Sequence, residues 1–454
     1  MQTECSAELF EFEPVEGRSV VAAFDGGAVT SDAGVLLLAK ADRKLGLTGR
    51  LAACFRDDRS ADQVEHRLEA MLRQRVFGIA LGYEDVVDHD ELRHDPAIGA
   101  AAGVLTARSA RSAALAGKST LNRLEHAPAG DPTRYHKIGH DGAAIERLFV
   151  DLFLDAHAAP PSRIVLDLDA TDDPIHGHQE GRFFHGYYDC YCYLPLYVFC
   201  GRHLLVAKLR RAGIDASAGA VAEMARVVGQ IRARWPEVEI VLRADSGFAR
   251  DALMSWCEAN RVDYVFGLAR NSRLEKMIAG ELAAAGEAAL ATGQAARRFK
   301  ELRYRTRDSW SCERRVVAKA EHTREKENPR FVVTSLQDEP RALYEDLYCA
   351  RGEMENRIKE CQLDLFADRT SAKTMRANQL RLWLASMAYV LVEALRRLGL
   401  PGSRLANATC GTIRLKLLKI GALVRLSVRR VKLAMASGCP FQEEWRTAYR
   451  ALAR

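Results

Sequence analysis

The apolar residues in the first third of the chain recur at helical spacing. Ser60, followed by Gln63 three positions later, is typical of the start of a helix. The apolar residues behind it fall on one helical face: Val64, Leu68, Met71, Leu72 and Ile79. After a strand-like segment at residues 19–24, helical patterns continue to about Phe153, so we expect a mainly helical region over residues 1–155.

From residue 163 onward the pattern changes to short apolar runs that are typical of buried strands. The predicted strands are residues 164–166, 192–199, 203–209, 238–242, 264–268 and 331–336. Helical patterns at residues 218–234 and 250–258 separate the later strands, and a long helix is predicted at residues 343–366. Three successive strands followed by alternating helices and strands indicate a mixed α/β sheet.

Residues 271–329 interrupt this alternation and look like an insertion, with strand-like patches near Trp310 and at residues 314–318. We therefore expect the insertion to split the α/β region into two parts. The predicted domains are residues 1–155, mainly helical; 156–270, the first part of the α/β core; 271–329, the insertion; 330–370, the second part of the core; and 371–454, a C-terminal region.

Charge is distributed unevenly along the chain. The 454 residues include 66 Lys and Arg and 60 Asp and Glu, a net charge of +6. Residues 373–454 hold sixteen Lys and Arg but three acids, a net charge of +13, so the remainder of the chain carries −7. A basic region on a slightly acidic body is expected where that region meets a polyanion, although a solvated basic surface gives the same pattern.

Neither a targeting signal nor a membrane span is visible in the sequence. The chain starts with polar and acidic residues at positions 1–4. The most apolar window, residues 382–392, is too short to cross a bilayer and is followed by Glu393 and Arg396. We therefore expect a cytoplasmic protein without a membrane partner.

Acidic residues stand at the ends of two predicted strands. Asp169 follows the strand at residues 164–166, and Asp245 follows the strand at residues 238–242. Acids at the carboxyl ends of adjacent strands can converge on one cation, and Mg²⁺ prefers carboxylate oxygens while it keeps positions open for water and phosphate. Two such ions about 4 Å apart would support an in-line displacement at phosphorus.

The predicted helix at residues 343–366 offers a third acid. Tyr348, Arg351 and Glu355 lie at i, i+3 and i+7 and therefore share one face. Lys359 follows one turn later. A glutamate for the metal, with arginine and lysine for phosphate, is a compact set for cutting nucleic acid. The same spacing also occurs in helices whose charged side chains form salt bridges in solvent.

These motifs resemble those of the DDE transposases of bacterial insertion sequences. The motifs that carry the resemblance are Asp169-Ala170-Thr171, Asp245-Ser246-Gly247-Phe248 and Tyr348-x2-Arg351-x3-Glu355. More closely, the chain resembles the "thirteen-eighty" insertion-sequence family, within the group marked by a Tyr-Arg-Glu-Lys pattern. The similarity extends over nearly the whole chain through Phe24-Asp25-Gly26-Gly27, Ser119-Thr120-Leu121-x-Arg123-Leu124-Glu125, His176-Gly177-x-Gln179-Glu180 and Gly186-Tyr187-Tyr188.

The resemblance implies an α/β fold: an RNase H-like mixed-sheet catalytic core with a β-rich insertion, a helical N-terminal DNA-binding region and a basic C-terminal region that binds DNA or mediates dimerisation. Asp169, Asp245 and Glu355 would be the catalytic ligands of Mg²⁺, with Mn²⁺ as a substitute. Trp310, in the insertion, would hold a flipped base, as an aromatic residue does in relatives, or it would be a buried residue of the core. The residues expected at the DNA are Tyr348, Arg351, Lys359, Trp310 and Arg123.

The activity that the resemblance implies is cut-and-paste transposition. A homodimer at the bacterial nucleoid would cleave double-stranded DNA at the inverted-repeat ends of its element and join the 3′-hydroxyl ends to target DNA. Two alternatives have the same core: a metal-dependent nuclease without strand transfer, and a catalytically silent DNA-binding regulator. The regulator would lack one of the acids, whereas all three are present here.

Two acids have neighbours that could replace them. Asp167 lies two residues before Asp169 on the same strand face and is a second candidate for the metal. We favour Asp169 because it matches the Asp-x-Thr motif of the family. Glu353 is a weaker alternative to Glu355, because a shift of two residues turns it away from Arg351.

The lysine of the Tyr-Arg-Glu-Lys pattern is missing from its usual place. The pattern has Lys seven residues after the glutamate, where this chain has Gln362. Lys359, one turn after Glu355, is the candidate for that role.

The sequence Gly117-Lys118-Ser119-Thr120 resembles the end of a phosphate-binding P-loop. Position 112 is Ser instead of the required Gly, and no buried strand precedes it, so we set nucleotide binding aside. We interpret the segment as a helix start capped by Ser119 or Thr120, with Arg123 facing DNA phosphate. An ordinary capped surface helix has the same pattern.

Two further patterns lie outside the acidic motifs. His176, His178, His185, Cys190 and Cys192 lack the spacing of a zinc site, so we favour a polar hairpin beside the active site. Beyond Gly411, apolar residues alternate with basic ones at residues 413–419, and four more basic residues follow at residues 425–432. This predicts two strands with one basic face along DNA, or an edge hairpin kept soluble by its charges.

Overall fold

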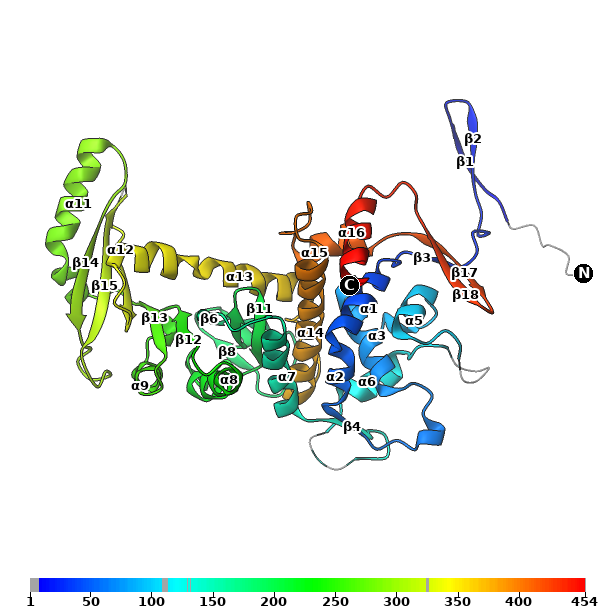
Figure 1. Ribbon diagram of the computed structural model, residues 1–454, viewed down its shortest axis with the longest axis horizontal. Coiled ribbons are helices and arrows are strands. Elements are labelled where there is room, and N and C mark those ends of the chain that lie inside the picture. The colour runs from blue at the N-terminus through cyan, green and yellow to red at the C-terminus, as the bar shows by residue number, and fades with distance from the viewer. Residues whose placement is uncertain (1–7, 108–112, 129, 131, 324–325, 454) are drawn as a thin grey trace, which may run out of the picture.

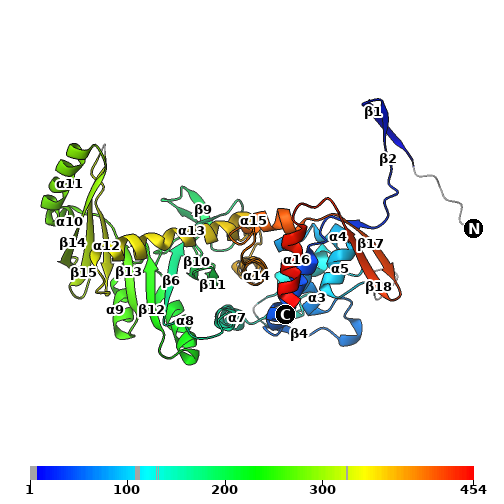
Figure 2. The same ribbon diagram turned by 45° about the horizontal axis from the view of Figure 1, so that its top comes forward.

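The computed structural model describes residues 8–107, 113–128, 130, 132–323 and 326–453. Figures 1 and 2 show an elongated molecule with a large sheet toward one end and the N-terminal helices toward the other. The longest helix, α14 (Met375–Gly399), stands between them. Within the described part of the chain, no helix is both long and apolar enough to cross a membrane.

The large sheet has eight strands in the order β11-β10-β6-β12-β13-β16-β15-β14. Its bounds are β6 (Arg163–Ala170), β10 (Leu196–Cys200), β11 (His203–Lys208), β12 (Glu239–Ala244), β13 (Asp263–Leu268), β14 (Ala296–Tyr304), β15 (Arg314–His322) and β16 (Arg330–Thr334). The central strand β12 runs parallel to both β6 and β13, and all other neighbours are antiparallel. The predicted mixed α/β sheet is confirmed.

Helices cover both faces of this sheet. On one face lie α7 (Gly142–Asp155), α8 (Ala220–Arg234) and α9 (Asp251–Ala259), which share one apolar cluster with the strands. Across the other face runs a continuous helical stretch from α12 (Pro340–Ala342) through α13 (Gly352–Lys359) to a π-helical turn that ends at Asp364 (Figure 2). The long helix predicted at residues 343–366 is therefore present.

The insertion differs from the β-rich module that was expected. It begins with two helices, α10 (Ser272–Met277) and α11 (Ala279–Thr292), and its strands β14 and β15 extend the main sheet. The sheet continues into the insertion because β15 pairs with β16 over residues 315–319. The strand predicted at residues 314–318 is present and longer than expected, whereas Trp310 lies in the loop before it.

Residues from both ends of the chain build the second body. Its N-terminal elements are β3 (Val29–Thr30), α1 (Val35–Leu45), α2 (Leu47–Ala52), β4 (Phe55–Asp57), α3 (Leu68–Leu81), α4 (His89–Leu92), α5 (Pro96–Ala102), α6 (Lys118–Glu125) and β5 (Ile138–His140). They pack with α14, α15 (Cys410–Ile413) and α16 (Gln442–Ala453) in one apolar cluster, and β17 (Ala422–Ser427) pairs with β3. The regions predicted as residues 1–155 and 371–454 thus share a core.

Two local predictions were wrong. The helix expected to start at Ser60 begins at Leu68, and residues 61–63 form one isolated turn without a side-chain cap. The first predicted basic strand, residues 413–419, is helical: α15 continues into a π-helical turn over residues 414–418. The reason is that Ile413 and Leu417, four residues apart, are both buried, while Leu415 is exposed, which is helical periodicity.

Two hairpins lie outside the main bodies. The second basic stretch does form one, from β17 and β18 (Arg430–Met435). At the N-terminus, β1 (Phe10–Val15) pairs with β2 (Arg18–Ala22), and this hairpin stands clear of the helices, with every residue exposed (Figure 1).

The joint between the two ends of the chain gives the first prediction. A Cβ at Gly34, just before α1, would lie 2.2 Å from the carbonyl oxygen of Leu417 and 2.4 Å from Cα of Leu418. We expect Gly34→Ala to lower the free energy of unfolding by about 1–3 kcal/mol, because backbone must shift. Gly229→Ala in α8 is the control, since open space surrounds it and alanine favours a helix. Equal melting temperatures for Gly34→Ala and wild type would contradict this packing.

Candidate active site

Asp169 and Asp245 lie at the same edge of the large sheet. Asp169 is the second-last residue of β6, and Asp245 directly follows β12. The two strands are adjacent and parallel, with Leu168 opposite Ala244, so both acids leave the sheet at its carboxyl edge. Asp245 also accepts a hydrogen bond of 2.9 Å from the backbone N–H of Gly247, which fixes the turn after the strand.

Arg351 brings the helix to these strands. Its Nη1 lies 3.5 Å from Oδ2 of Asp169, and its Nη2 donates to Oε1 of Glu355 at 2.7 Å. Tyr348 lies one turn earlier, with a pKa that is raised by burial and by the nearby charge of Asp245, while Arg351 opposes the rise. The structure therefore gathers Asp169, Asp245, Glu355, Arg351 and Tyr348, which the sequence had placed on three separate elements.

The electrostatics of the cluster call for a cation. Burial, together with the charges of Asp245 and Glu355, raises the pKa of Asp169 to about 7, although Arg351 opposes the rise. A carboxylate in this position is stabilised by positive charge. Carboxylate oxygens are hard donors of the kind that Mg²⁺ prefers.

Within the described residues, no three His, Cys, Asp or Glu side chains are placed to hold one metal ion together. In this arrangement Arg351 pairs with two of the three acids and supplies the positive charge between them.

Asp167, the alternative to Asp169, is engaged elsewhere. Its side chain is 3% exposed, and both of its oxygens accept hydrogen bonds from Arg243 of β12, one of them at 2.8 Å. Arg243 also donates to the carbonyl oxygen of Leu347. Asp167 thus orients an arginine that ties β6 and β12 to the helical stretch bearing Glu355.

Comparison with known proteins identifies the family of the chain. A family model described as "Transposase DDE domain group 1" matches residues 12–454. The chain belongs to the DDE transposase family. No curated protein matches the chain.

The other residues expected on the glutamate helix of the transposase have different surroundings. Glu353 and Lys359 are exposed to solvent. Gln362 donates hydrogen bonds to the carbonyl oxygen of Asp172, at 3.1 Å, and to Oδ1 of Asp173, at 3.0 Å. Gln362 therefore binds the loop after β6. Of Lys359 and Gln362, the two positions considered for the lysine of the family pattern, Lys359 is the exposed one.

A small sheet borders the acids of the transposase. It consists of β7 (Asp173–Pro174), β9 (Cys190–Tyr193) and β8 (Phe183–His185). The hydroxyl of Tyr188 donates to the carbonyl oxygen of Ala170 at 3.4 Å, and burial together with Asp172 and Asp169 raises the pKa of Tyr188 to about 12. Several aromatic side chains of this hairpin are exposed: Phe183, Phe184, Tyr187 and Tyr191. The expected hairpin beside the active site is present and is strongly aromatic.

Trp310 does not lie where it could stack on a base. Its side chain is 3% exposed and packs edge-on against Tyr304 at 5.7 Å, with the Arg314 guanidinium 5.7 Å from the ring. The prediction that Trp310 contacts DNA is wrong in this structure, because the ring belongs to the apolar cluster under the sheet.

Arg123 lies in the other body, on the exposed side of α6. The helix begins at Lys118 with Gly117 as its N-cap, so the expected side-chain cap by Ser119 or Thr120 is wrong. Arg123 lines a surface cavity of about 220 Å³ together with three other basic residues, Arg59, Arg134 and Lys137.

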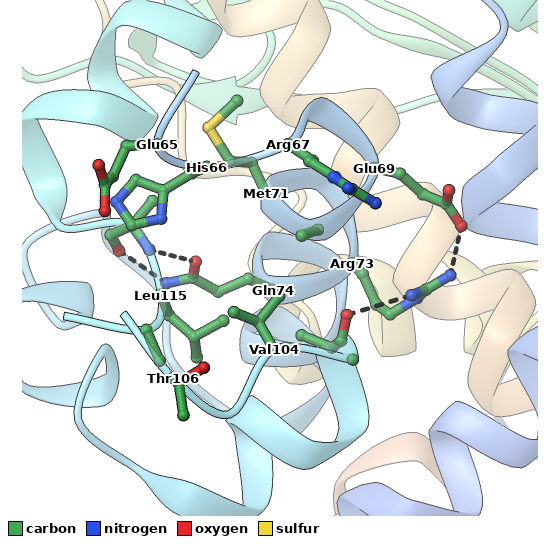
Figure 3. A pocket seen from close by; sticks show the side chains of 15 residues that line it. Glu65, His66, Arg67, Glu69, Met71, Arg73, Gln74, Val104, Thr106 and Leu115 are labelled. Atoms are coloured by element: carbon green, nitrogen blue, oxygen red, sulfur yellow. Dashed lines mark hydrogen bonds and ion pairs between the residues drawn. The ribbon is translucent and has the colours of Figure 1, made fainter. Parts of the chain in front are cut away.

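A second cavity of about 390 Å³ lies beside α3 (Figure 3). Two of its polar side chains are held by partners: Arg73 pairs with Glu69 and Asp42, and Gln74 bonds to the backbone of Ala116. None of the predicted site residues lines it.

Two residues that position the site were missed by sequence reasoning. One is Arg243, the partner of Asp167. The other is Gly267 in β13, where a Cβ would lie 2.5 Å from the hydroxyl oxygen of Tyr348 and 2.9 Å from the backbone nitrogen of Ser246. A glycine inside a buried strand was the available signal, since such a position often allows a close approach.

The contrast between the two aspartates of β6 gives the second prediction. Asp167→Asn should lower the free energy of unfolding by about 3–5 kcal/mol, because Arg243 would be left buried with an incomplete partner. Asp169→Asn should leave the melting temperature unchanged or raise it at pH 8 in metal-free buffer. Among the residues that the structure describes, Asp169 makes one ion pair, 3.5 Å from Arg351, and Arg351 keeps Glu355 as a partner when that pair is lost. Thermal melting of both variants measures the difference. A larger loss of stability for Asp169→Asn than for Asp167→Asn would reverse the two assignments.

Proposed function

We propose that this transposase binds the inverted-repeat ends of an insertion sequence of the "thirteen-eighty" family, cleaves DNA there and joins the 3′-hydroxyl ends to target DNA. The observation that carries the proposal is that Asp169 and Asp245 lie at the ends of adjacent parallel strands at one edge of the sheet, while Arg351 pairs with both Asp169 and Glu355. An RNase H-like core is supported by three successive antiparallel strands, followed by two parallel strands that are each preceded by a helix.

Asp169, Asp245 and Glu355 would hold the divalent ions that transposases of this family generally use, Mg²⁺ or Mn²⁺. Such ions, when bound, activate the attacking oxygen and stabilise the leaving oxygen of a displacement at phosphorus. Asp245 is preset for this role because the backbone of Gly247 fixes its carboxylate. Asp167 and Arg243 keep the strand and the helix bearing Glu355 in register.

Arg351 has a second task in this proposal. Its guanidinium pairs with Asp169 and Glu355 in this arrangement, and a DNA phosphate offers the same planar, two-oxygen recognition. When the phosphate arrives, Arg351 would turn to it and release the carboxylates. Tyr348 would position the same strand through its hydroxyl, and Lys359 would contact the backbone further along.

The remaining DNA contacts come from the other body. Arg123 and the basic residues around it would bind phosphate, as would the basic hairpin β17–β18. A homodimer would hold the two ends together in the synaptic complex. The nuclease alternative differs only in the joining step, so strand-transfer products separate the two.

The proposal is tested by variants of the three acids, which should bind end DNA but fail to cleave it. Asp169→Asn, Asp245→Asn and Glu355→Gln should each lower cleavage of end DNA at least about 100-fold, equal to about 2.7 kcal/mol, because each removes a metal ligand. Binding of the long duplex should remain, since it rests on phosphate contacts elsewhere. Glu353→Gln, exposed on the same helix, is the matched control and should cleave like wild type. Undiminished cleavage by any of the three variants would remove that acid from the site.

A separate prediction concerns Arg351. If its planar fork clamps the phosphate, Arg351→Lys should cut the single-turnover cleavage rate of a pre-nicked end substrate at least about tenfold, or about 1.4 kcal/mol. The melting temperature should hardly change, because partly exposed pairs at i, i+4 stabilise by about 0.3–0.5 kcal/mol. Arg341→Lys is the control, since Arg341 forms the same kind of pair with Glu345 on the same helical stretch. If Arg351→Lys cleaves at the wild-type rate, Arg351 does not clamp the phosphate, and its role is limited to the salt bridge with Glu355.

A further inference from the structure

The β17–β18 hairpin is an arm that is held only at its base. Ala422 and Leu423 pair with β3, and the N–H of Val424 donates to the carbonyl oxygen of Ala28 at 2.7 Å; beyond Val424 the two strands pair only with each other, up to the turn between Ser427 and Arg430. Figures 1 and 2 show the arm pointing away from the helices at the end of the molecule far from the large sheet. Residues 425–430 are all exposed.

One face of the arm carries three basic side chains. In the pairing register Arg425 lies opposite Lys432, and Ser427 opposite Arg430, so the three basic side chains project from the same face. No acid occurs between Glu393 and Glu443 in the sequence. Among the residues that the structure describes, no acidic side chain pairs with Arg425, Arg430 or Lys432. Such a face fits a polyanion, and a two-stranded ribbon fits a groove of duplex DNA.

The tip of the arm carries exposed apolar side chains, which binding by charge does not explain. Val428, in the turn, is fully exposed, and the neighbouring Leu426 is 56% exposed. The turn is held in shape by Ser427, whose Oγ accepts from the N–H of Arg430 and donates to its carbonyl oxygen, both at 3.1 Å. A branched apolar side chain is thus presented at a braced tip between basic residues.

We propose that Val428 is a wedge that enters between base pairs of bound DNA, so that the arm bends the duplex while Arg425, Arg430 and Lys432 hold its backbone. The proposal rests on the proposed function in one respect, that the chain binds duplex DNA. Apolar side chains inserted between base steps kink the duplex, and the added backbone contacts offset the cost of unstacking. Binding of DNA by charge alone would not require an exposed valine at the tip of the arm.

The experiment uses the full chain and a short duplex with a central TA step, which unstacks easily, and with a donor and an acceptor dye at its two ends. We expect wild type to raise energy transfer, corresponding to a bend of about 20–90°. Val428→Ser should bind within about threefold of wild type, with the same salt dependence, but should leave the duplex nearly straight. Because the Val428 side chain is fully exposed, the melting temperature of the Val428→Ser protein should equal that of wild type.

Two further variants separate the wedge from the basic face. Leu290→Ser, at an 84% exposed apolar position of α11, should bend DNA like wild type. Arg425→Gln with Arg430→Gln should weaken binding and lower the slope of log affinity against log salt by about 0.9 for each lost phosphate contact.

Several outcomes would overturn the proposal. Bending by Val428→Ser equal to that of wild type would show that the tip does not act as a wedge. A wild-type protein that cleaves end DNA but leaves the duplex straight would overturn the wedge while the proposed function stands. A wild-type protein that neither binds nor cleaves DNA would overturn both.

Discussion

The burial of α14 on nearly all sides is the constraint on which the rest of the structure depends. Eighteen of its 25 residues are buried, and it packs against α1, α3, α16 and strand β11 of the large sheet. A helix that is apolar around its circumference must be enclosed by other elements. The N-terminal helices, the C-terminal helix and the edge of the sheet provide that enclosure, so α14 determines where the two bodies lie.

The same helix also holds the helical stretch that bears Glu355 in place. Nη1 of Arg396 in α14 lies 3.1 Å from Oε2 of Glu360, which in turn pairs with Arg357, two residues after Glu355. All three charged side chains of this network are buried. Removing one partner of a buried ion pair leaves an uncompensated charge, so the network specifies one register of α13 against α14. The position of Glu355 is therefore stabilised by ion pairs that lie outside the candidate active site, between its helix and α14.

The sequence could predict the sheet and its acids because those signals are local. Short apolar runs ending in Asp169 and Asp245, and the spacing of Tyr348, Arg351 and Glu355, depend on residues close in the chain. The role of Asp167 could not be predicted, because its partner Arg243 comes from another strand. Trp310 was misplaced for a similar reason, since its burial depends on contacts with Tyr304 and Arg314. Residues 413–419 satisfied both a strand and a helix pattern, and tertiary burial decided between them.

The core shared by the two ends of the chain also orders the folding of the protein during its synthesis. The first helix of the second body begins at Val35, but α14, which fills its centre, begins at Met375. At a ribosomal rate of about 5–20 residues per second, the early helices wait on the order of 20–70 s for their main packing partner. The strands from β6 to β16 emerge during that interval and can pair first. A nascent chain can therefore complete the large sheet before its terminal body, and a ribosome that stops early releases a chain with the aspartates in place but with the apolar faces of α1 and α3 uncovered.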